Sequence, residues 1–182
     1  ETRLQTLIQR SFPEALVGPH ASLRTEGRDF RTVKELRTEN GPIDYWAPMG
    51  NACRAFRRKV GDFPSEPGFL IADETEVEAW TKQLAQMGPG LKVGLLWKSL
   101  KMTAKRQKNF AAFELWKPIL QTPGVTFVNL QYGDVDEELA RAEAEFGVKI
   151  HQPDGIDLKN DLDRVAALGK ALDLTIGPMN AT

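Results

Sequence analysis

The chain has 182 residues and a formal net charge of −1, which gives it no general attraction to nucleic acid or to an anionic membrane. Its length is sufficient to bury the core of one sizeable domain or of parts of two. One cysteine, Cys53, and two histidines, His20 and His151, exclude an internal disulfide and zinc sites of the usual ligand spacing.

The sequence contains no segment that resembles a signal peptide, and no apolar run approaches the roughly 20 residues that cross a bilayer. We therefore expect a cytoplasmic protein without a membrane span. Glu1 is not a start methionine, so the chain could come from a longer protein. The absence of a signal peptide is therefore weaker evidence for a cytoplasmic location.

The first third of the chain is expected to contain two helices and two short strands. Leu4, Leu7 and Ile8 share one helical face, and Pro13 stops that helix. In chain order we expect a helix over 2–12, a strand over 15–17, a loop over 18–41 with one helical turn near 33–36, a strand over 43–47 and a helix capped by Asn51.

A domain boundary is expected near residue 70. Residues 61–67 contain a glycine and two prolines, which are typical of a surface crossing. Asp73 and Glu76 then form a capping-box pattern that opens a helix ending at Gly88. We therefore expect one unit over 1–70 and a second over 71–182.

The stretch from 91 to 134 organises the second unit. An apolar strand over 92–97 precedes a loop over 98–108, a helix over 113–120 and a second apolar strand over 125–130. Such a crossover places two parallel strands side by side, and ligands of open α/β sheets collect at the carboxyl ends of those strands. The loop leaves the first strand at that end.

The loop over 98–108 is cationic and contains no acidic residue. Its cations are Lys98, Lys101, Lys105, Arg106 and Lys108. A phosphate at this position would meet these side chains and the amide groups that open the following helix. A solvated surface loop explains the same charges, and the residues alone leave both interpretations open.

The rest of the chain repeats the alternation of helix and strand. We expect a helix over 135–146, a strand over 148–150, a helix over 161–170 and a strand over 172–176. The expected fold class is therefore α/β, with a doubly wound, mostly parallel sheet. Because the chain stops directly after a strand, we expect native sequence to continue beyond Thr182.

Familiar catalytic and nucleotide-binding patterns are missing from the sequence. It has neither a Ser/His/Asp arrangement nor either glycine-loop motif for nucleotides. Asp134, Asp136, Glu137 and Glu138 fall in one helical first turn, where negative charge is favoured without a metal, and we expect no metal site. Asp161 and Asn180 are expected at the carboxyl side of the sheet, where hydroxyl-rich ligands need acceptors and amides.

The order of several segments resembles a known family. KVGLLW, a basic loop, a helix, PGVTFVNLQYGD, DLKNDLDRVAALGKALDLTIG and PMNAT together resemble the carboxyl-terminal half of GT-B glycosyltransferases. The resemblance is greatest to glycosyltransferase-like domains attached to tetratricopeptide repeat arrays in bacteria, related to heptosyltransferases. RLQTLIQRSFPEALV and APMGNACRAFRRKVGDFP resemble the later part of their amino-terminal subdomain.

The resemblance implies a Rossmann-like GT-B half that binds a nucleotide-sugar donor, with no cofactor and no obligatory metal. Its donor-binding positions would be Trp97, Lys98, Lys105, Lys108, Gln131, Tyr132, Gly133, Asp161 and Asn180, with Gly50 and Asn51 on the acceptor side of the cleft. Lys108 would stabilise the diphosphate leaving group. The implied acceptor is a protein or a surface polymer.

Two departures from the family pattern leave the catalytic residues unassigned. Met179-Asn180 stands where many relatives carry an Asp-Thr pair, and the chain ends before the histidine that follows that pair. In the family, a general base is expected from the early loops of the amino-terminal subdomain, and these loops are not part of this chain. The sequence therefore favours a glycosyltransferase, with a non-catalytic nucleotide-binding or protein-interaction module of the same fold as the alternative.

Overall fold

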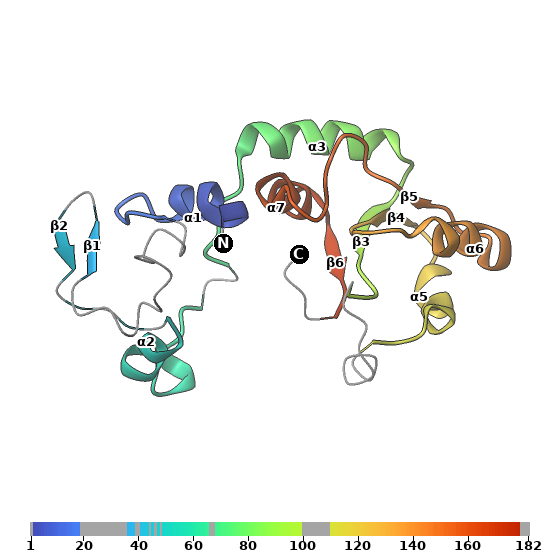
Figure 1. Cartoon of the computed structure of the whole chain (residues 1–182). Coiled ribbons are helices and arrows are strands. Elements are labelled where there is room, and N and C mark those ends of the chain that lie inside the picture. Colours follow the sequence, from blue (N-terminus) through green and yellow to red (C-terminus); the bar gives the residue numbers. More distant parts are fainter. Residues whose placement is uncertain are drawn as a thin grey trace. The chain divides into compact units, whose positions relative to one another are not determined.

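The structure is a computed structural model that describes residues 2–18, 36–38, 41–43, 45, 47, 49–65, 68–99 and 110–178. The chain divides between Leu70 and Ile71 into two compact units, unit 1 (residues 1–70) and unit 2 (residues 71–182). Figure 1 shows the elements of each unit along the chain.

Unit 1 combines short helices with a two-stranded hairpin. In chain order its elements are η1 (Thr2–Leu4), α1 (Gln5–Ser11), β1 (Leu36–Thr38), β2 (Gly41–Ile43), α2 (Met49–Phe56) and η4 (Val60–Asp62). Leu7 is the buried residue of α1, on the face that the sequence predicts. The strands β1 and β2 pair antiparallel, with Leu36 opposite Ile43.

Two strand predictions in unit 1 are wrong. Residues 15–17 form no strand, because side chains of α1 take up the backbone of Val17: Gln9 Oε1 accepts its N–H at 3.1 Å and Gln5 Nε2 donates to its carbonyl at 3.1 Å. The strand expected over 43–47 lies instead at Gly41–Ile43, paired with a strand in a stretch that was expected to be loop. The helical turn expected near 33–36 lies mostly outside the described residues. Hydrophobic periodicity does not reveal which strands pair, because strand pairing depends on contacts between residues that are distant in sequence.

The helix α2 begins at Met49, three residues before the start expected from a cap at Asn51. Asn51 lies inside the first turn of α2 and is not its cap, since a cap residue has a non-helical backbone. Gly50 and Asn51, the residues expected on the acceptor side, are both exposed in this turn.

Unit 2 alternates helices and strands. Its elements are α3 (Glu74–Gln86), β3 (Leu91–Leu95), η5 (Phe113–Trp116), α5 (Lys117–Leu120), β4 (Val125–Asn129), α6 (Asp136–Phe146), β5 (Ile150–His151), α7 (Leu162–Ala171) and β6 (Leu174–Ile176). The Asp73 carboxylate caps α3 by accepting the N–H groups of Thr75 and Glu76. Gly147 ends α6 with a left-handed backbone, as expected of a helix stop.

Among the described residues of unit 2, four strands form one parallel sheet in the order β5-β4-β3-β6. Val93 pairs with Phe127 of β4 on one side and with Leu174 of β6 on the other, so β3 is central. The strand β5 extends the sheet beyond β4. The chain thus winds outward from β3 in both directions, which confirms the predicted α/β fold with a Rossmann-like arrangement.

Helices cover both faces of the sheet (Figure 1). On one face, Val93, Leu95 and Phe127 pack with residues of η5, α5 and α6, including Trp116 and Phe146. On the other face, Val128 and Leu130 pack with residues of α3 and α7, including Trp80, Leu84 and Leu168. Because β3 is buried on both faces, its sequence is a nearly continuous apolar run, and this run is the pattern from which the strand was predicted.

The crossover between β3 and β4 is less regular than predicted. The helix expected over 113–120 is a 3-10 turn, η5, followed by the four-residue α5. Pro118 lacks the N–H that a continuous α-helix would need at this position, so the turn tightens before α5 begins. Phe113, Trp116 and Leu120 nevertheless face the core.

We predict that Gly94→Ala destabilises the protein by about 1–3 kcal/mol, because a Cβ at Gly94 overpacks the core. This Cβ would lie 2.5 Å from Leu130 Cδ1 and 2.7 Å from Leu172 Cδ1, and both leucines are buried. The matched control is Gly169→Ala in α7, where a Cβ meets no atom within 4 Å and a gain of about 0.5–1 kcal/mol is expected. Urea unfolding of both variants checks the prediction, and equal effects would contradict it.

Candidate functional site

The candidate site lies where the winding of the sheet reverses. From β3 the chain moves to β4 and β5 on one side, and it returns through α7 to β6 on the other side. In open α/β sheets, ligands bind outside the carboxyl ends of the two strands that flank this reversal. Here these strands are β3 and β6.

The chain segments that leave β3 and β6 run against each other. Leu96 N–H donates to the carbonyl of Ile176 at 3.0 Å, which extends the strand pairing by one residue. A Cβ on Gly177 would lie 2.9 Å from both Cβ and the carbonyl oxygen of Leu96. Glycine is therefore needed where the two segments meet.

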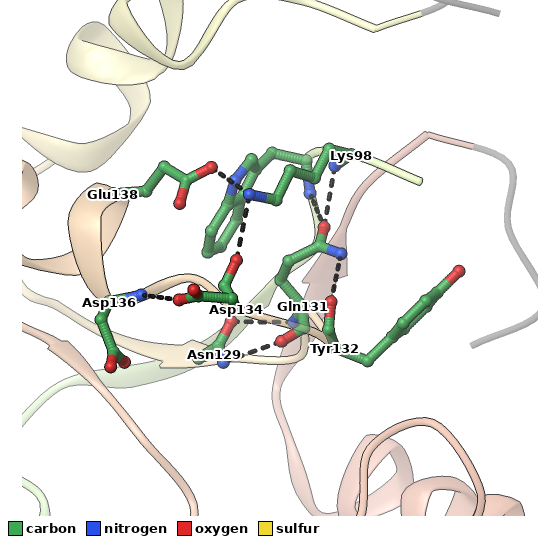
Figure 2. A network of polar contacts seen from close by, with 8 residues as sticks. Lys98, Asn129, Gln131, Tyr132, Asp134, Asp136 and Glu138 are labelled. Carbon is green, nitrogen blue, oxygen red and sulfur yellow. Dashed lines mark hydrogen bonds and ion pairs between the residues drawn. The ribbon is translucent and has the colours of Figure 1, made fainter. Parts of the chain in front are cut away.

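The side chain of Gln131 fixes the backbone after β3. Its Oε1 accepts the N–H groups of Trp97 and Lys98, at 3.1 and 2.8 Å, and its Nε2 donates to the carbonyl of Tyr132 at 3.0 Å (Figure 2). The residue is only 1% exposed. Gln131 thus joins the loops after β3 and β4, and both the oxygen and the nitrogen of its carboxamide bond to the protein's own backbone.

Asn129, at the end of β4, holds Gln131 in turn. Asn129 Oδ1 accepts the N–H of Gln131 at 2.8 Å, and Asn129 Nδ2 donates to the Gln131 carbonyl at 3.0 Å (Figure 2). The same Nδ2 donates to Gln152 Oε1, beyond β5, at 2.7 Å. Asn129 was not predicted as a site residue, although an amide in the mostly apolar stretch 125–130 was the available signal, and the structure buries it completely.

Lys98 is engaged by the first turn of α6. Its ammonium pairs with the carboxylate of Glu138 and donates to the carbonyl of Asp134 at 3.3 Å (Figure 2). Both paired side chains are partly buried. The first cation of the predicted basic loop is therefore already partnered within the protein.

Trp97 belongs to the core. Its ring is buried against Phe113, with 5.2 Å between ring centroids, and its Nε1 has no hydrogen-bond partner among the described residues. In this structure its side chain contributes packing, and its backbone N–H is taken by Gln131. No exposed surface of Trp97 faces a ligand.

The other described donor-side positions lie in different surroundings. Tyr132 packs against the cluster formed with α3 and α7, and its ring points away from the Lys98–Glu138 pair (Figure 2). Gly133 has a φ of 93°, a conformation that glycine adopts readily. Asp161 precedes α7, and its carboxylate lies 3.8 Å from Arg164, whose Nε pairs with Glu76 of α3 at 2.8 Å.

Lys105, Lys108 and Asn180 lie outside the described residues, so their placement stays a prediction. Gly50 and Asn51 lie in unit 1, and their position across a cleft also stays a prediction. The structure therefore brings together Trp97, Lys98 and Gln131, through backbone and side-chain hydrogen bonds.

The described side chains of this edge are polar and form no metal-binding arrangement. Within the part of the chain that the structure describes, no three His, Cys, Asp or Glu side chains gather so as to hold a metal ion. Likewise, no helix in the described ranges is long and apolar enough to cross a membrane. The described polar side chains of this edge, Lys98, Asn129 and Gln131, are each engaged by other groups of the protein.

An open hollow of about 440 Å³ lies at the opposite, amino-terminal edge of the sheet. Its lining includes Pro89, Gly124, Lys149 and His151. The pKa of His151 is lowered, mainly by burial and then by the charges of Lys149 and Lys92. The Lys92 ammonium is itself held by the carbonyls of Gly88 and Gly90. This edge lies away from the strand ends at which ligands of such sheets bind.

We predict that Gln131→Leu destabilises the protein by about 2–4 kcal/mol, because it leaves the N–H groups of Trp97 and Lys98 without their acceptor. The control is Gln86→Leu at the exposed end of α3, which should change stability by no more than about 0.5 kcal/mol. Urea unfolding measures both. A loss at Gln131 as small as that of the control would show that the two N–H groups find other partners.

The chain is similar in sequence to a known bacterial protein. The chain is 50% identical over its 182 residues to Protein FlbA of Caulobacter vibrioides, and it spans 30% of the length of that protein. No protein-family model matches the chain, and no solved structure matches it.

Proposed function

We propose that the chain is a glycosyltransferase-like domain in which unit 2 binds a nucleotide-sugar donor and the sugar is transferred to a protein or surface-polymer acceptor. The observation that carries the proposal is the close contact of the segments leaving β3 and β6 at the reversal point of a parallel sheet. The order of sequence motifs that resembles GT-B enzymes supports it independently.

The proposed donor lies with its diphosphate beside the basic loop. This loop starts at Lys98 and contains Lys105 and Lys108, so several cations are available to a leaving group that gains negative charge during transfer. The Tyr132 ring and the Gly133 backbone lie next to Gln131 and provide surface for the nucleoside. Asp161 and Asn180 supply polar groups for ribose or sugar hydroxyls, and no cofactor or metal is required in this scheme.

Lys98 takes part by exchanging partners. In the structure its ammonium is paired with Glu138, and a phosphate competes with this carboxylate for the same cation. Donor binding then includes release of Lys98 from α6. Gln131 keeps the backbone of Lys98 in place while the side chain changes partner.

On the acceptor side, the proposal assigns Gly50 and Asn51, which are exposed in the first turn of α2. No residue is assigned as the catalytic base. The engagement of Lys98 by Glu138 favours a second candidate function, a non-catalytic module of the same fold that binds nucleotide or a protein partner, because the Lys98 ammonium already has a partner within the protein.

Calorimetric titration with uridine, guanosine, cytidine and adenosine diphosphates tests the proposal. One of them is expected to bind, and Lys108→Ala should weaken its affinity at least about tenfold through loss of a charge-assisted contact. The matched control is Lys170→Ala, which removes the same charge in the last turn of α7 and should leave affinity unchanged. Absence of binding to every nucleotide, or equal effects of both variants, would refute the donor site. Binding without sugar transfer to any acceptor would favour the non-catalytic module.

The partner exchange of Lys98 gives a separate prediction. Glu138→Gln should tighten binding of the same nucleoside diphosphate by about fivefold, because the competing ion pair of about 1 kcal/mol is lost. Glu137→Gln removes the same charge from the same helical turn at an exposed residue. If both variants tighten binding equally, the effect is general repulsion by α6 and the exchange does not occur.

A further inference from the structure

A second surface of the protein lies in unit 1, in the segment from Arg54 to Phe63, which ends α2 and contains η4. Every residue of this basic–apolar segment is exposed. Its large apolar side chains are Phe56, Val60 and Phe63, with exposed fractions of 72%, 91% and 55%. Three such side chains within eight positions are an unusual concentration of apolar surface in contact with water.

The same segment is strongly cationic, although the whole chain has a net charge of −1. Its cations are Arg54, Arg57, Arg58 and Lys59, against a single carboxylate, Asp62. Asp62 Oδ2 accepts the backbone N–H groups of Arg58 and Lys59, both at 2.9 Å. The one acidic group therefore shapes the turn that presents the cations.

Stabilisation of α2 accounts for only part of this pattern. Cations near the carboxyl end of a helix complement its dipole, which explains the charge at Arg54 and the residues just after Phe56. It does not explain Val60 and Phe63, which lie beyond the helix and keep more than half of their side-chain surface in water. Apolar surface in water is unfavourable in free energy, and contact with an apolar medium would remove this penalty.

We propose that the basic–apolar segment is a docking surface for anionic phospholipid headgroups at a membrane surface. Charge complementarity selects an anionic partner, and the interleaved apolar side chains enter the boundary between headgroups and acyl chains. Side chains as exposed as Phe56 and Val60 form no pocket of their own. A bilayer accepts separate apolar side chains without a preformed shape, whereas a folded partner would have to supply a matching pocket for each.

Sedimentation with lipid vesicles tests the proposal. The chain should bind vesicles of phosphatidylcholine that contain phosphatidylglycerol, and binding should fall with added salt. Each Lys or Arg near such a surface contributes about 1 kcal/mol, or about fivefold, so Arg57→Gln with Arg58→Gln should lower the partition coefficient about 25-fold. The control pair Lys82→Gln and Lys170→Gln makes the same charge change at exposed positions of unit 2 and should retain binding.

A second measurement locates the contact. Cys53 is the one cysteine of the chain and is exposed in α2, so an environment-sensitive fluorophore can be attached beside the segment. Its emission should shift to the blue with anionic vesicles, and the shift should be lost in Phe56→Ser with Phe63→Ser. A label at Lys82→Cys in a Cys53→Ser background should not shift, which separates insertion of this segment from binding elsewhere.

Three results would overturn the proposal. The first is absence of binding to anionic vesicles, which would leave a protein partner as the explanation of the exposed side chains. The second is equal binding to pure phosphatidylcholine, or an equal loss of binding in the control pair. The third is displacement by inorganic phosphate at concentrations where chloride of the same ionic strength has no effect, because this would identify a site for free phosphate. None of these results depends on donor binding by unit 2.

Discussion

The structure of the candidate site depends on one side-chain oxygen. Oε1 of Gln131 accepts the backbone N–H groups of Trp97 and Lys98, at the point where β3 has ended and strand pairing no longer supplies an acceptor. Buried N–H groups without a partner are costly, so this contact sets the path of the chain as it leaves the sheet. Asn129 and Gln152 extend the same network across the ends of β4 and β5. Three strand ends are thereby joined by amide side chains, which carry no charge and titrate at no physiological pH.

Two glycines allow close packing around β3, one within the strand and one after the neighbouring strand β6. Gly94 allows Leu130 and Leu172 to pack over the central strand, and Gly177 allows the segment after β6 to pass directly against Leu96. Both depend on the missing Cβ and not on an unusual backbone conformation. The backbones of the two segments therefore approach closely at the reversal point, and the proposed donor recognition depends on the segments that follow Lys98 and Pro178.

The sequence predicted unit 2 well and unit 1 poorly, for a physical reason. The strands β3 and β4 and the helices α3, α6 and α7 are recognisable because burial on two faces or one face imposes a regular apolar period, and Asp73 and Gly147 mark helix ends. In unit 1 the hairpin depends on pairing of β1 with β2, and Val17 is held by the side chains of Gln5 and Gln9, so neither leaves a periodic signal. Within the site, the resemblance to GT-B enzymes implied one donor site for Trp97, Lys98 and Gln131, and hydrogen bonds join these three residues in the structure. Their contacts could not be predicted from the sequence, because the burial of Trp97 and the backbone hydrogen bonds of the Gln131 carboxamide follow from tertiary packing.

The electrostatics of this edge restrict where an anion can bind. Asp136, Glu137 and Glu138 occupy the first turn of α6, so the positive end of this helix is already neutralised by its own carboxylates, and Glu138 also engages Lys98. On the other crossover, η5 and α5 are short and separated by a change of helix type, which gives a weak dipole. Neither helix end favours a diphosphate by itself. In the proposed donor site, anion affinity therefore depends on the side chains of the basic loop, which carry full charges where the helix ends carry only partial charges.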